Sequence, residues 1–166
     1  MSYPVNLVDV AAVVMAAACA RTTLHDLSPK ARKLWRLGLP PLLGIGVSLL
    51  LLAGAVVSFE HDITWMVTAL VGTLAGWLRG RRIPVRTDQV WGTIRTPVTY
   101  DAVIAGFCLF AITLADSLSG LLSVGFLPRH AHMAAASGLF AGYIAGRAWS
   151  LGRRAVEAPH SELGLQ

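Results

Sequence analysis

Aspartates inside or beside apolar segments are the residues of this sequence best suited to chemistry. Asp9, Asp101 and Asp116 each lie within about a turn or two of the end of such a segment. A carboxylate in hydrocarbon is costly to hold, so it points by default to proton or cation handling. The alternative is a structural role, because the helix dipole favours an acid near a helix N-terminus. Asp101 is the candidate functional acid, and Arg81 or Arg95 is its expected partner.

Three histidines lie near the ends of two apolar segments. His61 precedes one segment, and His130 and His132 open another. Two imidazoles at one depth on facing helices can hold a haem through both axial positions. Histidines at a membrane interface more often contact water or headgroups, however. We therefore expect no cofactor and no bound metal, with His61, His130 and His132 as the haem candidates.

The two cysteines do not suggest thiol chemistry. Cys19 and Cys108 lie in different apolar segments and form no Cys-x-x-Cys pair, so buried core thiols are expected. The sequence also lacks a His-Glu-x-x-His motif, a phosphate-binding glycine loop and an ordered Ser-His-Asp set. No catalytic residue is assigned, and we expect a protein that is not an enzyme.

The elements that carry these residues are typical of a membrane protein. The chain is 55% hydrophobic and 14% charged, with a mean hydropathy of +0.61, whereas soluble domains carry about 25% charged residues. A helix of about 20 apolar residues crosses a hydrocarbon core of about 30 Å. We predict an all-α integral membrane protein, a single domain over residues 1–166 folded as a five-helix transmembrane bundle. The predicted helices are residues 5–20, 40–59, 63–78, 97–118 and 131–149.

The basic residues orient this bundle. All 14 Lys and Arg residues except Arg129 lie in the loops 21–39 and 79–96, or at and beyond the end of the fifth helix. The positive-inside rule makes that side cytoplasmic, with the N-terminus outside, the C-terminus inside and a flexible tail over residues 155–166. Arg147 is expected to snorkel toward the cytoplasm. Because topology accounts for the net charge of +5, nucleic acid is not an expected partner.

A glycine-containing sequence motif that occurs twice predicts close helix packing. GTLAGWLRGRR (72–82) and GLFAGYIAGRA (138–148) each end an apolar block. Residues four apart share one helix face, so a glycine at every fourth position makes a groove that another helix backbone can approach. The helix-packing candidates are Gly72, Gly76, Gly80, Gly138, Gly142 and Gly146. A shift of 66 positions also lays helices two and three on helices four and five. A duplicated helical hairpin would give this match, and so would chance similarity between helices rich in small residues.

The two basic loops contain local structure of their own. Ser28 before Pro29 is typical of a helix start, and residues 30–37 mix basic and apolar side chains as a short interfacial helix on anionic lipid would. Such a helix would serve as an anchor or in lipid signalling. Alternating apolar residues in 83–95 predict a small cytoplasmic β-hairpin. Thr96 before Pro97 is expected to cap the fourth helix.

The order of these features suggests a family. An apolar helix ends in RGRR, the basic segment IPVRTDQVWGTIR follows, the next helix opens with TPVTYDAV, and a late helix reads GLFAGYIAGR. This layout, which covers most of the chain after about Leu37, resembles the CcdC-like group of small polytopic bacterial membrane proteins. The resemblance implies a multi-pass protein of the bacterial inner (plasma) membrane that acts as an accessory or assembly factor. It carries over no catalytic residue.

Two functions stay open at this stage. The first is a non-enzymatic accessory or assembly factor whose glycine grooves pack against a second copy or a larger membrane complex. The second is a small transporter with a site between the two helical hairpins. A transporter ordinarily places polar groups or a broken helix near the bilayer midplane. Between residues 40 and 78 the sequence offers there only Ser48, Thr68, Thr73 and glycines, which favours the accessory role. The lipid bilayer is the expected partner in either case.

Overall fold

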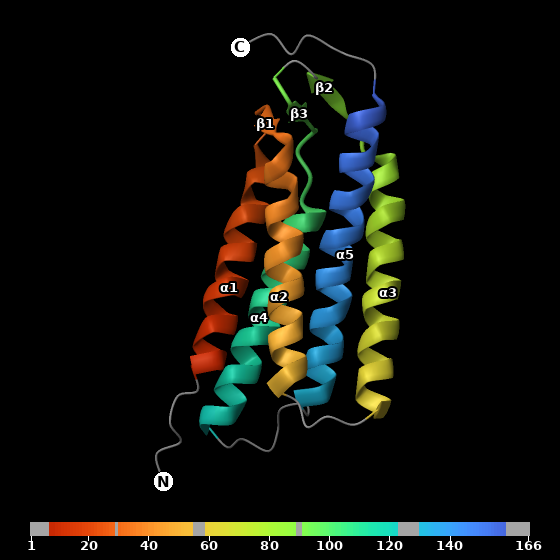
Figure 1. Cartoon of the computed structure of the whole chain (residues 1–166). Coiled ribbons are helices and arrows are strands. Elements are labelled where there is room, and N and C mark those ends of the chain that lie inside the picture. Colours follow the sequence, from red (N-terminus) through yellow and green to blue (C-terminus); the bar gives the residue numbers. More distant parts are fainter. Residues whose placement is uncertain (1–6, 29, 55–58, 89–90, 123–129, 159–166) are drawn as a thin grey trace.

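Helices account for most of the protein in a computed structural model. The structure describes residues 7–28, 30–54, 59–88, 91–122 and 130–158, with backbone alone at 59–60, 120–122 and 130–131 (Figure 1). The long helices are α1 (Leu7–Thr23), α2 (Leu39–Gly54), α3 (Phe59–Arg82), α4 (Asp101–Leu122) and α5 (His130–Glu157). The connections contain the 3-10 helices η1 (Leu24–Leu27) and η2 (Leu34–Gly38) and the strands β1 (Arg32–Lys33), β2 (Arg86–Asp88) and β3 (Thr93–Arg95).

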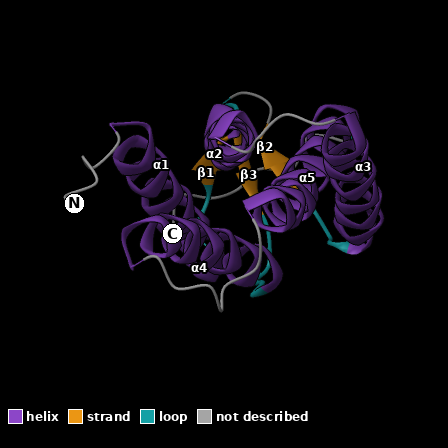
Figure 2. Ribbon diagram, turned by 90° about the horizontal axis from the view of Figure 1, so that it is seen from below, coloured by secondary structure: helices purple, strands orange, loops and turns teal. Residues whose placement is uncertain are grey.

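The long helices lie side by side, and the strands gather at one end of the bundle, called here the sheet end. α1, α3 and α5 run toward the sheet end, and α2 and α4 run away from it (Figure 1). Seen along the bundle, α3 lies at one edge beside α5, and α1 lies at the opposite edge (Figure 2). The main core is built by α1, α2, α4 and α5 from Ala16, Cys19, Val47, Leu51, Ala105, Leu109, Ala134 and Ile144. α3 therefore stands outside this core and packs chiefly on α5.

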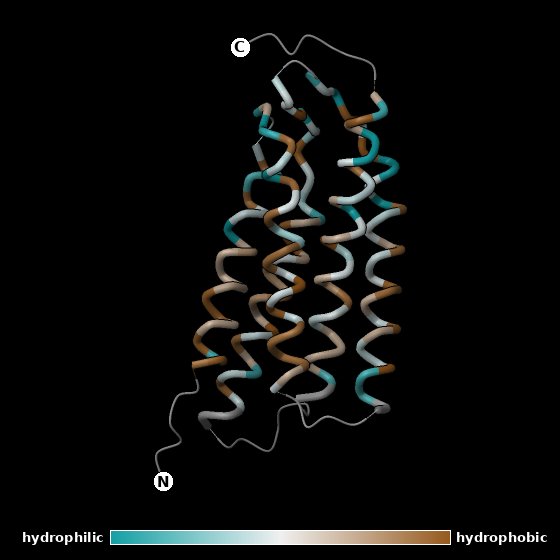
Figure 3. Tube along the Cα trace, viewed as in Figure 1, coloured by the Kyte–Doolittle hydropathy of each residue, from teal (hydrophilic) through white to brown (hydrophobic). Residues whose placement is uncertain are grey.

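Hydropathy along the bundle is that of a membrane protein. Within the described residues, three helical segments are long and apolar enough to cross a bilayer: Leu7–Leu27, Leu34–Gly54 and Asp101–Ser119. Apolar residues follow the middle of the bundle, and hydrophilic residues concentrate at the sheet end (Figure 3). α3 and α5 do not reach the same hydropathy because both contain several charged residues and histidines, together with glycines.

Several helix ends differ from the predicted ones. α3 continues to Arg82, and α5 continues to Glu157, so residues 155–157 are helical and not tail. The fourth helix begins at Asp101, and the expected cap at Thr96 is wrong. The chain before Asp101 is non-helical, and the hydroxyls of Thr96 and Thr99 accept hydrogen bonds from arginines elsewhere in the fold.

The two loops at the sheet end form one three-stranded antiparallel sheet in the order β1-β3-β2. The hairpin expected within 83–95 is present as β2 and β3, and Gly92 turns the chain between them with φ of +57°. The interfacial helix expected over 30–37 is wrong. Residues 32–33 pair with β3, because β3 offers a free ladder edge, and the 3-10 turn η2 follows. Ile94 of β3 is fully buried with Leu37 and Ala155 beneath the sheet.

Candidate functional site

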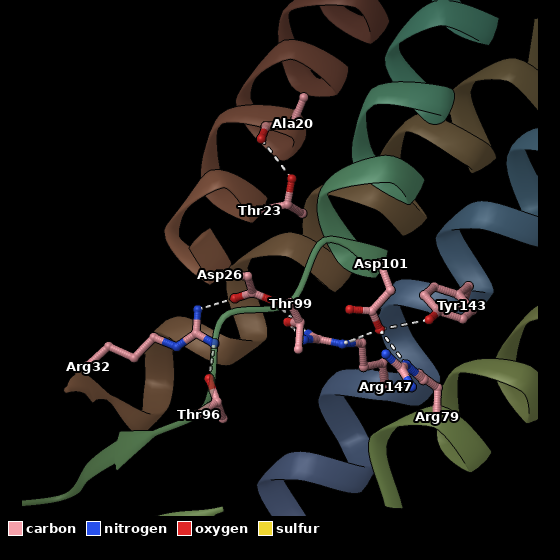
Figure 4. A network of polar contacts seen from close by, with 10 residues as sticks. All are labelled: Ala20, Thr23, Asp26, Arg32, Arg79, Thr96, Thr99, Asp101, Tyr143 and Arg147. Atoms are coloured by element: carbon pink, nitrogen blue, oxygen red, sulfur yellow. Dashed lines mark hydrogen bonds and ion pairs between the residues drawn. The ribbon is translucent and has the colours of Figure 1, made fainter. Parts of the chain in front are cut away.

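A row of charged side chains ties together the elements at the sheet end (Figure 4). Arg147 of α5 lies at its centre, with Nη1 2.7 Å from Asp26 Oδ2 and Nε 3.1 Å from Asp101 Oδ2. Asp26, in η1, also pairs with Arg32 of β1. Asp101 also pairs with Arg79 of α3, whose Nε lies 3.4 Å from Oδ2. Positive and negative groups therefore alternate along the row, and each carboxylate lies between two guanidinium groups.

The segment that leads into α4 completes this charged row. Arg147 Nη2 donates a hydrogen bond to Thr99 Oγ1 at 2.7 Å, and Arg32 Nη2 donates to Thr96 Oγ1 at 3.2 Å. The backbone N–H of Thr99 donates to the carbonyl of Asp26 at 3.1 Å. These bonds hold residues 96–99 in an extended path between η1 and α5.

Asp101, the acid singled out from the sequence, lies within this row. Its partners come from α3 and α5, so the expected pairing with Arg81 or Arg95 is wrong. Arg81 lies over the ring of Trp77, with its Cζ 4.7 Å from the ring centroid. Tyr143 donates its hydroxyl to Asp101 Oδ2 at 2.9 Å. Oδ2 thus receives three donors, while the buried Oδ1 has no hydrogen-bond partner within the described part of the chain.

Burial makes the centre of the row energetically important. Arg147 is 4% exposed and Asp26 is 6% exposed. The expectation that Arg147 snorkels into water is therefore wrong, because its guanidinium finds two carboxylates and a hydroxyl inside the fold. Removing one partner of a buried ion pair costs about 3–5 kcal/mol, since the other charge is left uncompensated. The ion pairs of the row hold η1, β1, α3, α4 and α5 in fixed positions relative to one another.

The glycines of the repeated motif lie between α3 and α5 and face one another. A Cβ at Gly72 or Gly76 would overlap the backbone carbonyl of Leu139 or Tyr143 in α5. Farther along, Gly80 meets Ser150, whose Cβ would be 2.8 Å from an added Cβ, and Gly138 meets the ring of Trp65 at 3.0 Å. In a membrane such backbone contact replaces much of the hydrophobic drive for association. The glycine grooves of α3 and α5 therefore pack against each other within one chain.

The contacts across this crossing are symmetric. Gly72 of α3 lies against the carbonyl of Leu139, and Gly142 of α5 lies against the carbonyl of Ala69. The two glycines are 70 positions apart in the sequence, and so are the two residues that supply the carbonyls. Gly76 and Gly146 repeat the pattern with the carbonyls of Tyr143 and Thr73. Each oxygen occupies the place of a Cβ, which is the direction of a Cα–H···O contact. The parallel pair thus has a local pseudo-two-fold axis. Its register differs by one helical turn from the 66-position sequence match, and the duplication stays a prediction.

Arg154 of α5 closes the end of the α3/α5 crossing. Its Nη1 lies 3.2 Å from the carbonyl oxygen of Gly80, 2.9 Å from that of Arg81 and 2.6 Å from that of Ile83. The last carbonyls of a helix lack intrahelical partners and carry partial negative charge. A cation from the neighbouring helix satisfies them here, which stabilises the C-terminus of α3 against α5.

A second polar chain lies deeper in the bundle. Trp65 Nε1 donates to Ser48 Oγ at 2.8 Å, and Ser48 lies 3.1 Å from Ser137 Oγ. Ser137 donates to the carbonyl of Ala134 at 2.7 Å, so Ser48 is the donor in the serine pair. The side-chain donors of Trp65, Ser48 and Ser137 therefore all have an acceptor. The polar groups expected near mid-bundle therefore bind α2, α3 and α5 to one another.

The function is inferred from the geometry of the charged row and the helix packing described above. No family model, curated protein or solved structure matches the chain.

The other candidate residues lie apart from the charged row. His61 and His132 are exposed near the starts of α3 and α5, and the side chain of His130 is outside the described residues. Cys19 is buried and Cys108 is half-buried, and both are free thiols. Among the described residues no three His, Cys, Asp or Glu side chains are grouped to hold a metal ion.

Sequence reasoning found Asp101 but missed the row around it. Asp26 and Arg147 are far apart in the chain, and nothing in the local pattern links them. The available signal was Arg147 itself, because an arginine within an otherwise uncharged helical block requires a partner or access to water. Tyr143, one turn before Arg147 on the same helix face, points to the same site.

Proposed function

We propose that the protein is a five-span protein of the bacterial inner membrane, with its N-terminus outside and its C-terminus in the cytoplasm. Two features support α3 and α5 as additional spans. They have 24 and 28 residues, and each lies parallel to α1 along the bundle. At 1.5 Å per residue both exceed a hydrocarbon core of about 30 Å. The basic residues of both loops lie at the sheet end, which the positive-inside rule assigns to the cytoplasm.

Reporter fusions test this threading. Fusions at Arg36, at Arg86 and after Arg154 should report the cytoplasm, and fusions at Asp62 and Ser119 should report the outside. A cytoplasmic signal at Asp62 would overturn the five-span arrangement, because α2 would then not cross the bilayer.

Within this topology we assign a non-enzymatic accessory or assembly role. The observation that carries it is the buried charged row centred on Arg147, which fixes five elements at the sheet end. Alternating access would require that end to open and would leave buried charges without partners, at several kcal/mol each. The hydrogen-bonded chain through Ser48 and Ser137 supports the same conclusion at mid-bundle. The resemblance to CcdC-like proteins points to this class of role as well.

The glycine grooves do not supply the partner surface of this accessory role, because α3 and α5 use them on each other. The outward face of α3 is the surface proposed to meet a second copy or a larger membrane complex. It presents a continuous apolar stripe made of Ile63, Met66, Val67, Leu70, Val71, Leu74 and Leu78. Residues at this spacing share one side of a helix.

Two measurements separate the accessory role from the transporter. Purification in a mild detergent should recover a larger membrane complex or a homo-oligomer, and Leu70→Ser with Leu74→Ser should release it. Spin labels at Lys33 and Arg82, in a chain with Cys19 and Cys108 replaced by Ala, should give one narrow distance distribution. Two populated distances would show that the sheet end opens and would favour transport.

A further inference from the structure

A pocket of about 460 Å³ opens between α1 and α2 at the sheet end. Its upper wall comes from η1, β1 and η2, and its lower wall comes from the start of α2 and from α4 and α5. The lower wall is apolar and includes Leu39, Pro40, Ala102 and Ile144. The volume falls within the range of about 300–1,000 Å³ that is usual for ligand sites.

Positive charge dominates the upper wall of this pocket. Lys30 and Arg36 are exposed, and within the described residues neither pairs with a carboxylate. Arg32 and Arg147 also line the pocket, where Asp26 neutralises part of their charge. Asp101 also pairs with Arg147, so the positive charge of the pocket that no described carboxylate offsets comes from Lys30 and Arg36. Lysine and arginine in this density recognise an anion, and arginine is suited to phosphate oxygens.

An apolar groove of about 710 Å³ adjoins the pocket. It runs between η2 and the last turns of α5 and shares Trp35, Leu37 and Ala148 with the pocket wall. Its own lining is largely hydrocarbon, and includes Trp149, which is 71% exposed, and Val156. Tryptophan at this position is typical of the boundary between headgroups and acyl chains. A cationic pocket and an apolar groove therefore meet at one wall.

We propose that these adjoining cavities bind one anionic phospholipid of the inner leaflet. The phosphate lies in the pocket against Lys30 and Arg36, and an acyl chain lies in the groove beside Trp149. Charge complementarity selects the headgroup, and apolar burial retains the tail. The proposal rests on the proposed topology, which places the sheet end at the cytoplasmic interface. The reporter fusions test that topology separately, so a failure of the topology can be distinguished from a failure of lipid binding.

Short-chain lipids test the site on the full-length protein in a non-ionic detergent. Dioctanoyl-phosphatidylglycerol should raise the melting temperature in a saturable manner, whereas dioctanoyl-phosphatidylcholine and inorganic phosphate should raise it much less. Lys30→Gln with Arg36→Gln should increase the phosphatidylglycerol concentration for half-maximal effect by about tenfold or more, because each basic group near an anionic headgroup contributes to binding. Both side chains are exposed, so this variant keeps the fold.

Two further variants make the result specific. Lys33→Gln removes one positive charge from the same segment but lies outside the pocket, and it should bind phosphatidylglycerol as the unmodified protein does. Nothing lies within 4 Å of a Cβ at Gly152, so Gly152→Phe places a ring in the groove and should weaken lipid binding. Equal effects of the two lipids, or equal loss in Lys33→Gln and Lys30→Gln/Arg36→Gln, would overturn the proposal. A shift with inorganic phosphate as large as that with phosphatidylglycerol would replace it with a soluble-anion site.

Discussion

Replacing a single hydrogen by a methyl group at Gly76 should weaken the α3/α5 crossing measurably. A Cβ there would stand 2.8 Å from the carbonyl carbon of Tyr143, whereas ordinary contact begins at 3.4 Å. The carbonyl oxygen of Tyr143 lies closer still and would overlap the added Cβ, so the two backbones must part by more than the 0.6 Å that the carbon alone requires. A gap of about 0.5–1 Å already forfeits roughly a quarter to a half of the dispersion energy along the contact. Overpacking of this kind costs about 1–3 kcal/mol. The gain in helix propensity, up to about 1 kcal/mol, offsets part of this cost, and Gly76→Ala should lower the free energy of unfolding by the remainder.

The same substitution at Gly152 provides a matched control in α5. Nothing lies within 4 Å of a Cβ at that position, and alanine is favoured over glycine in a helix by up to about 1 kcal/mol. Gly152→Ala should be neutral or stabilising, so the two variants should differ in sign. Gly106 is less suitable as a control, because Thr23 Oγ1 would lie 2.6 Å from its Cβ. The measurement is reversible unfolding in mixed micelles with increasing sodium dodecyl sulfate. Equal or greater stability of Gly76→Ala would refute the close backbone approach.

Three further outcomes test the charged row and the histidines. Arg147→Met should lower the free energy of unfolding by about 3–5 kcal/mol because two buried carboxylates lose their shared partner. Arg147→Lys should recover part of this loss, and equal losses in both variants would count against the bridging geometry. Tyr143→Phe removes one donor from Asp101 and should cost about 1.5 kcal/mol, since two guanidinium groups remain; no change in the same unfolding assay would exclude the bond. The purified protein should show no Soret band, and a band that His61→Ala abolished would establish the haem alternative.

The helices were predictable because their cause is local. An uncharged block of sufficient length forms a helix in lipid wherever its neighbours lie, since every backbone group must be satisfied within the segment. Glycine spacing likewise predicted a flat face at Gly72 and Gly76. It did not predict the partner helix, because a row of glycines lets any helix backbone approach closely and does not specify which helix it is.

The charged row and the first strand were not predictable for the converse reason. Asp26 and Arg147 meet only once the whole bundle is assembled. Asp26 lies in the stretch predicted as the loop 21–39, and the sequence around Arg147 suggested a snorkelling arginine. Residues 32–33 have the composition of an interfacial helix, but β3 supplies an unpaired ladder edge that an isolated segment cannot anticipate. In both cases a partner distant in sequence decided the outcome.

The position of α3 sets an order for biogenesis. It is the third helix to leave the ribosome, yet its packing surface is supplied chiefly by α5, the last. In the proposed five-span topology, the glycine face of α3 is covered by lipid until α5 is inserted, and the C-terminal carbonyls of α3 lack the cap from Arg154. A chain interrupted after α4 therefore retains the main part of its core but leaves one helix unattached. The unpaired glycine face of α3 is therefore the feature that distinguishes such an unfinished chain from the complete one.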